Sequence, residues 1–183
     1  LSDQLNKHRM VTGLSVLRKI RRALREKDFN VTVTISLPVN EKSKSHILNI
    51  QPGQWDHRTF GLAIDIGTTT IYGVLLALSR GKILAKESAY NPQMSYGEDV
   101  IARIIYAEKP KGLAMMQDLV VDTINTLINE MLKKATPPDQ CGHGAITSDE
   151  INSITIPGNT TMTNLILRIE PDNISSSPYF TCS

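Results

Sequence analysis

The chain has 183 residues, and 40% of them are hydrophobic, which is enough to bury a core and excludes a disordered chain. No apolar run reaches the roughly 18 residues that a transmembrane helix needs. No secretory leader is visible either, so we expect a cytoplasmic protein without a membrane partner.

The two cysteines, Cys141 and Cys182, lie far apart, which argues against a disulfide framework and an iron–sulfur cluster within these residues. Cys141 and His143 are residue types that bind metal ions, but the sequence shows no second pair of ligands to complete a site, so we expect a polar loop there.

The first 58 residues predict a small α+β unit, in which a helix is followed by two strands. Leu14, Leu17 and Leu24 recur at helical spacing. Residues 29–37 alternate apolar and polar side chains, as in a strand with one wet face, and residues 46–50 predict its partner. We place the end of this unit, including its linker, at residue 58.

Charge is distributed unevenly along the chain, although the net charge is only +2. Residues 1–58 hold eleven Lys/Arg against five Asp/Glu, whereas the remainder holds nine against thirteen. Arg18, Arg22 and Arg25 place much of the positive charge on the first helix. A solvated helix face explains such a run, and docking to an acidic protein partner is the alternative. Nucleic acid is disfavoured because interleaved aromatic residues and a reading motif are missing.

Residues 59–183 predict a larger unit that begins with an antiparallel sheet. Apolar strands at 61–66, 70–78 and 83–89 are separated by short turns, an order that favours hairpins. Ser95 and Glu98 then have the spacing of a capping box at the start of a helix.

A longer helix follows, and two prolines at 137–138 prevent its continuation. Residues 154–156 predict a short buried strand, and Gly158 leads into a last helix that Pro171 ends. The apolar stripe of the longer helix comprises Leu113, Met116, Val120, Ile124, Leu127 and Met131.

An acid at the end of the first strand of this unit is the main candidate for chemistry. Asp65 lies between two isoleucines, and a carboxylate buried in a strand is costly unless it has a partner. Gly67 allows the backbone to approach a ligand closely, and the next three residues offer N–H groups and hydroxyls to phosphate oxygens. These hydroxyl residues are Thr68, Thr69 and Thr70. The segment predicts a phosphate-binding hairpin in which Asp65 holds Mg²⁺ through water, and a plain hairpin with a Thr-rich turn is the alternative.

A second polar turn lies between a strand and a helix, at Gly158, Asn159 and Thr160. Backbone N–H groups in such a position favour anions, so these residues are candidates for binding a cofactor. A simple N-cap by Asn159 or Thr160 explains the same sequence.

The hairpin, residues 63–70, resembles the first phosphate loop of the superfamily that unites acetate and sugar kinases, heat-shock chaperones and actin. Two further segments narrow the resemblance. Asn91-Pro92-Gln93, followed by residues 96–104, is similar to a signature of the reductive activators of corrinoid proteins, and so are residues 157–162. The resemblance covers about residues 60–180, while the first unit resembles that family's middle domain in layout only.

The resemblance implies that residues 59–183 are the first lobe of an actin-like (ribonuclease H-like) ATPase domain. In that family an iron–sulfur domain delivers an electron, and ATP binding and hydrolysis drive the reduction of an inactive Co(II) corrinoid to Co(I). It implies ATP and Mg²⁺ as cofactors, a corrinoid protein as partner and a homodimer as an option. An iron–sulfur cluster is expected only in a part of the protein absent here.

Gln93 and Asp99 are expected to reach into the cleft near the γ-phosphate, as groups that position or activate water. For Asp99 a favourable charge at a helix N-terminus is the alternative explanation.

The sequence departs from the family pattern at several points. Asn164 stands where the family usually has His, and Arg168 stands where it usually has Gly. The cysteine ligands, the second phosphate loop and the adenosine motif are missing, so we expect a fragment without ATP turnover of its own. Two alternatives stay open: a small-molecule kinase of the same superfamily and a non-catalytic binding module.

Overall fold

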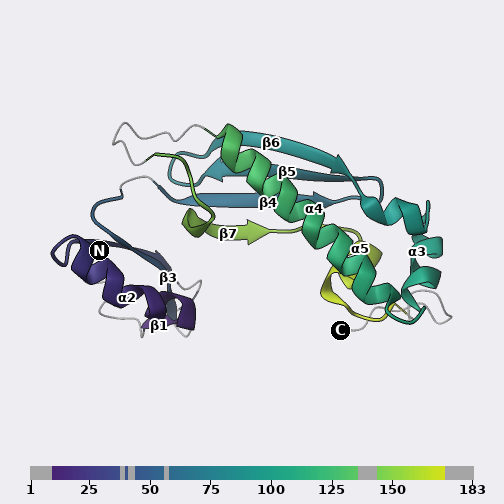
Figure 1. The fold of residues 1–183 in the computed structure, drawn as a ribbon, viewed down its shortest axis with the longest axis horizontal. Helices are drawn as coiled ribbons and strands as arrows, with labels where there is room; N and C mark the ends of the chain where they lie inside the picture. Colours follow the sequence, from purple (N-terminus) through teal and green to yellow (C-terminus); the bar gives the residue numbers. More distant parts are fainter. Residues whose placement is uncertain (1–9, 38–39, 41–43, 56–57, 136–143, 172–183) are drawn as a thin grey trace.

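The computed structural model describes residues 10–37, 40, 44–55, 58–135 and 144–171. These residues form two mixed β-sheets and four α-helices, which confirms the predicted α/β class. The smaller sheet and its helix lie beside one end of the larger sheet (Figure 1). The identification of the larger sheet as an actin-like lobe stays a prediction.

The smaller sheet has the strand order β1-β3-β2. Strands β2 (Val31–Ser36) and β3 (Ser45–Pro52) are antiparallel partners, as the alternating sequence predicts. Strand β1 (Met10–Thr12) pairs in parallel with β3. Strand β1 was not predicted, because a run of three residues has no readable periodicity.

Helix α2 (Leu14–Glu26) packs on β3, but with a different face from the predicted one. It buries Val16 and Ala23, whereas Leu14 and Leu17 are 62% and 51% exposed. Small side chains let a helix approach its neighbour closely, so the larger leucines lie away from the sheet.

The larger sheet has the strand order β6-β5-β4-β7. The strands β4 (Phe60–Ile66), β5 (Thr70–Ala77) and β6 (Lys82–Tyr90) form the predicted antiparallel hairpins. Strand β7 (Ile151–Thr155) pairs in parallel with β4. The prediction that this strand is buried is wrong, since Ile154 is 53% exposed. Among the described residues β7 is an edge strand with a neighbour on one side alone, so fewer side chains flank Ile154 than flank a residue of a central strand.

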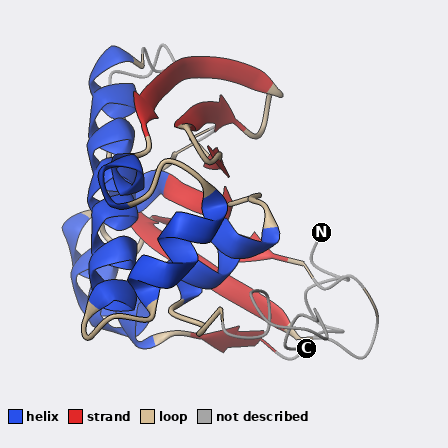
Figure 2. Ribbon diagram, turned by 90° about the vertical axis from the view of Figure 1, so that its right-hand side faces the viewer, coloured by secondary structure: helices blue, strands red, loops and turns tan. Residues whose placement is uncertain are grey.

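Helix α4 (Gly112–Lys134) lies across one face of the larger sheet, and the side view separates the helix from the strands (Figure 1, Figure 2). Gly73 of β5 permits this close packing, because a Cβ there would lie 2.9 Å from the Cε of Met131. The buried face follows the predicted stripe, with Leu113 only half-buried. Its fully buried apolar members are Met116, Val120, Ile124, Leu127 and Met131.

Two short helices, α3 (Val100–Ala107) and α5 (Thr160–Leu167), contact each other and pack against α4, where Gln117 Nε2 donates to Ile166 O at 2.6 Å (Figure 1). The predicted capping box at Ser95 is wrong. Ser95 lies in the 3-10 helix η1 (Pro92–Tyr96), and α3 begins later, with Asp99 as its N-cap. An Asp directly before the first helical residue satisfies a free backbone N–H, which sets the start of the helix.

Helix α5 ends at Arg168, whose backbone is left-handed (φ 55°, ψ 37°). A side chain in this conformation costs about 1 kcal/mol relative to glycine. We therefore expect Arg168→Gly to have a free energy of unfolding about 1 kcal/mol higher than Arg168→Ala. Both variants lose the exposed ion pair between Arg168 and Asp118, so their difference in urea denaturation isolates the backbone effect. Equal stability of the two variants would contradict this account of the helix end.

Candidate functional site

The predicted phosphate-binding segment is a tight turn, residues 67–70, between β4 and β5. Gly67 N donates to Thr70 O at 3.0 Å and closes the turn. A Cβ on Gly67 would lie 2.6 Å from that same oxygen, closer than real Cβ contacts. The turn itself therefore requires glycine at this position, whether or not a ligand approaches the backbone.

The tip of the turn presents backbone donors to solvent. In the described part of the chain, the N–H groups of Thr68 and Thr69 donate to no protein acceptor. Thr69 and Thr70 are exposed, and Thr68 is half-buried. Free N–H groups next to hydroxyls are the kind of donor set that binds phosphate oxygens.

Asp65 is exposed, which corrects the expectation of a buried acid. Side chains alternate along β4, so Ile64 and Ile66 face the core and are at most 2% exposed, whereas Asp65 points to the opposite face. Tyr72 lies across from it in the register with β5. A carboxylate in this setting needs no buried partner and is accessible to a hydrated Mg²⁺ ion.

The second predicted segment lies directly beside the turn. Ile66 N donates to Pro157 O at 3.0 Å, and Ile66 and Gly158 form an isolated parallel bridge. The amide of Asn159 donates from Nδ2 to Thr68 Oγ1 at 3.3 Å, while its Oδ1 caps α5. The structure thus brings the turn and the N-terminus of α5 together. Asn159 is also the N-cap of α5, which was the alternative explanation of this segment.

The remaining candidates, Gln93 and Asp99, have different surroundings. Gln93 is 1% exposed, and its Nε2 donates to Met116 O in α4 at 2.9 Å. Asp99 is exposed, and its Oδ1 accepts from Ala102 N at 2.7 Å. Gln93 therefore connects η1 to α4 in this structure, and a role at a γ-phosphate requires its side chain to turn away from Met116.

Asn91, for which no role was predicted, donates two hydrogen bonds to the turn. It is 1% exposed, and its Nδ2 donates to Gly67 O at 2.9 Å. Its backbone N–H donates to Thr69 O at 2.8 Å. One sequence feature indicated this position, because Asn91-Pro92 opens the segment that resembles the corrinoid activators. No sequence feature indicated the contact with Gly67, which lies 24 residues earlier in the chain.

Arg103 is a second buried residue that the sequence analysis left without a role. It is 0% exposed, and its Nε donates to Gly97 O at 2.9 Å. Its Nη1 lies 3.6 Å from Met162 Sδ, and its Nη2 has no partner in the described part of the chain. Burial lowers the pKa of this guanidinium, and the nearby charge of Asp99 opposes the shift. Arg103 thus contacts both the loop before α3, through Gly97, and helix α5, through Met162.

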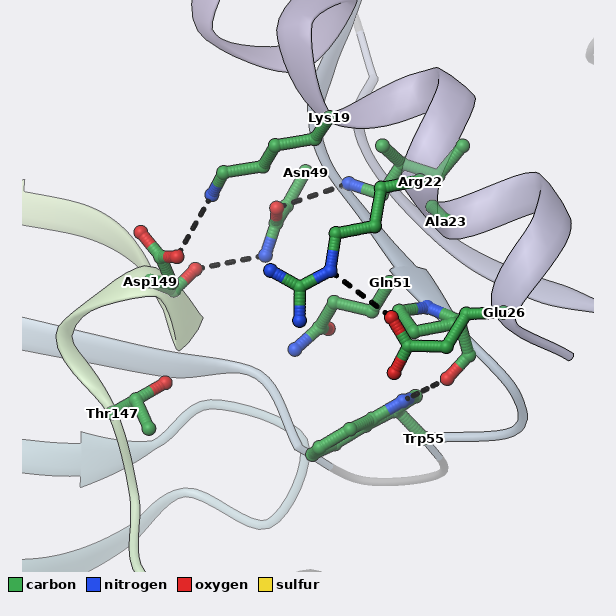
Figure 3. A pocket seen from close by; sticks show the side chains of 11 residues that line it. Lys19, Arg22, Ala23, Glu26, Asn49, Gln51, Trp55, Thr147 and Asp149 are labelled. Carbon is green, nitrogen blue, oxygen red and sulfur yellow. Dashed lines mark hydrogen bonds and ion pairs between the residues drawn. The ribbon is translucent and has the colours of Figure 1, made fainter.

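A pocket of about 280 Å³ lies between α2, β3 and the segment that precedes β7 (Figure 3). None of the turn residues lines it. Its basic side chains are already paired, Lys19 with Asp149 at 3.0 Å and Arg22 with Glu26 at 3.1 Å. The side chain of Trp55 borders the same space (Figure 3). With its charges paired, this pocket offers less to a phosphate group than the turn does.

Metal ligation by side chains alone finds no support in the described ranges. They contain no group of three or more His, Cys, Asp and Glu residues arranged to hold a metal ion. Cys141, His143 and Cys182 lie outside the described residues. Mg²⁺ at this site would depend on Asp65 together with phosphate oxygens and water, the usual ligands of that ion.

In the same described residues, no helix is both long enough and apolar enough to cross a membrane.

Comparison with known proteins gives consistent matches along the whole chain. Residues 1–57 match the RACo linker region, and residues 60–183 match the RACo middle region. The middle region thus matches the larger unit, whereas the sequence had suggested that the first unit resembles the family's middle domain. The corrinoid activation enzyme RamQ of Eubacterium limosum is 31% identical over 144 residues, which cover 78% of this chain and 21% of that protein. A solved structure of a reductive activator for corrinoid, iron-sulfur protein is 38% identical, with a TM-score of 0.77. That match covers 100% of this chain and 27% of the other, so the chain spans only a small part of these relatives.

Proposed function

The chain belongs to the RACo family, whose linker and middle regions it comprises, and from this premise we propose that it is part of an ATP-dependent reductive activator. The longer protein returns the cobalt of a corrinoid protein from Co(II) to Co(I). Within it, residues 1–58 form the small unit with its linker, and residues 59–183 form the first lobe of an actin-like ATPase domain.

The observation that carries the proposal is the donor set of the turn at residues 67–70. Thr68 and Thr69 keep their N–H groups free of protein acceptors, and Gly67 is required for the turn that exposes them. Asp65 is exposed on the strand that leads into this turn. Phosphate oxygens need such donors, and Mg²⁺ needs an accessible carboxylate, so the residues present fit Mg·ATP.

Each candidate residue receives a role in this proposal. The N–H groups and hydroxyls at 68–70 hold phosphate oxygens, and the α5 N-terminus, with Gly158, Asn159 and Thr160, adds donors beside them. Asp65 orients hydrated Mg²⁺. Asp99 positions the attacking water, with Gln93 as its partner once its amide has turned from α4. Bound Mg·ATP supplies the free energy that an uphill reduction of Co(II) requires.

The exposed basic residues of α2 suit a protein partner. Arg18, Arg22 and Arg25 are exposed on this helix. We assign this face to docking against an acidic protein surface, where complementary charge accelerates association and weakens with salt. The iron–sulfur cluster belongs to another part of the longer protein, and a homodimer is a further option for its assembly.

The proposal is tested with the longer protein, a reductant, and its corrinoid partner in the Co(II) state. Mg·ATP should cause the Co(II) absorption spectrum to be replaced by that of Co(I), while Mg·ADP should not. ATP consumption that phosphorylates a small molecule without any change at cobalt would instead favour the kinase alternative. The same spectral change without nucleotide would contradict the proposed coupling.

A further inference from the structure

Asn91 binds the phosphate-binding turn at two points and is itself held in place. Its Nδ2 donates to Gly67 O at 2.9 Å, and its backbone N–H donates to Thr69 O at 2.8 Å. Its Oδ1 accepts from Gln93 N at 3.0 Å, which ties the side chain to η1. Because Asn91 is 1% exposed, these bonds are shielded from water.

These contacts decide which way the peptide groups of the turn point. In a trans peptide the C=O and the following N–H point in opposite directions. Holding Gly67 O on Asn91 therefore turns the N–H of Thr68 away from Asn91. The N–H of Thr68, one of the two free donors of the turn, is thus directed to the side opposite the buried Asn91.

We propose that Asn91 is a positioning residue that keeps the donors of this turn directed at phosphate, an inference that rests on the proposed binding of Mg·ATP. Gly67 tolerates backbone conformations that other residues avoid, so the peptide between Gly67 and Thr68 rotates readily unless its oxygen is held. A rotated peptide presents a carbonyl oxygen to the phosphate in place of an N–H. A donor is then replaced by a partial negative charge, which weakens the binding of an anion.

The test substitutes Asn91→Asp in the longer protein, which preserves the shape of the side chain but places a carboxylate oxygen against Gly67 O. Asn49→Asp is the matched control. Asn49 is 4% exposed and makes the same kind of bonds. Its Nδ2 donates to Asp149 O at 2.8 Å, and its Oδ1 accepts from Ile50 N at 3.0 Å.

Calorimetric titration should show the Kd of Mg·ATP raised about tenfold or more by Asn91→Asp, since donors to a charged group are lost. The Kd of adenosine, which lacks phosphates, should stay unchanged, and Asn49→Asp should alter neither value. In the nucleotide-free protein, the N–H of Gly67 should exchange with solvent faster in Asn91→Asp than in the parent, as measured by NMR.

The outcomes separate this inference from the proposal on which it rests. A parent protein that binds adenosine but gains nothing from the phosphates of Mg·ATP would overturn the proposed phosphate site itself. If the parent prefers Mg·ATP and Asn91→Asp keeps that preference, or loses both ligands equally, the positioning role is wrong. If Asn91→Asp does not fold, Asn91→Ala is measured in its place, because it removes the same bond without adding charge, and it is judged by the same comparison.

Discussion

In the longer protein, Asp65→Ala is expected to lower the rate of Mg·ATP hydrolysis by at least about a hundredfold, because metal stabilisation of a transferring phosphoryl group contributes several kcal/mol. The fold should survive, since Asp65 is exposed and exposed substitutions of this kind usually change stability by less than about 0.5 kcal/mol. Steady-state phosphate release measures the first effect, and thermal unfolding followed by circular dichroism measures the second.

Asp122→Ala provides the matched control, because Asp122 is an exposed carboxylate on α4 and has no part in the proposed site. It should hydrolyse ATP at the parent rate. Asp65→Asn should resemble Asp65→Ala, since an amide keeps the size of the side chain but loses the charge that orients hydrated Mg²⁺. Parent-level hydrolysis by both Asp65 variants would remove Asp65 from the site.

The sequence was informative where a local rule decides the structure. Alternation over residues 29–37 predicted β2, and the short turns between apolar runs predicted the antiparallel hairpins of β4, β5 and β6. The stripe along α4 was readable because its buried positions recur at 3.6-residue spacing, the period of a helix. The Asp65–Thr70 segment was located correctly at the end of β4 and in the turn that follows.

Local rules failed where small residues alternate with large ones. The run Gly61–Ile66 reads as apolar apart from Asp65, so its sequence did not show that the face with Gly61, Ala63 and Asp65 opens to solvent at Asp65. In α2 the same difficulty arose, because Ala23 is a weaker hydrophobic signal than Leu17 although it lies against the sheet. The exposed face of β4 and the buried face of α2 are therefore set by which neighbours approach closely.

The contacts that assemble the candidate site were beyond local reading. Asn159 and Thr68 are 91 residues apart in sequence, and Arg103 and Met162 are 59 apart. No periodicity or motif spacing brings such pairs together, since the parallel pairing of β7 with β4 is what places α5 beside the turn. The resemblance named both motifs, but only the fold shows that they are neighbours.

Glu150→Gln should lower the free energy of unfolding of the chain by about 3 to 5 kcal/mol, the usual cost of removing one partner from a buried ion pair. The side chains of Arg58 and Glu150 are 0% and 1% exposed, and Arg58 Nε lies 2.5 Å from Glu150 Oε1. Glu150 Oε2 accepts from Arg58 Nη2 at 2.9 Å and from Thr147 N at 2.8 Å. Both carboxylate oxygens thus face donors alone, and an amide NH₂ in either position meets another donor.

The location of this pair explains why its loss should affect the whole chain. Arg58 lies just before β4, with its guanidinium 5.2 Å from the ring of Trp55 and 5.8 Å from that of Phe60, while Glu150 directly precedes β7.

Asp118→Asn is the control, because it breaks the exposed pair with Arg168 and should cost at most about 1 kcal/mol. Urea denaturation compares the two. Equal small losses in both variants would mean that the Arg58 guanidinium is held by the carbonyls of Gly144 and Ala145 rather than by the charge of Glu150.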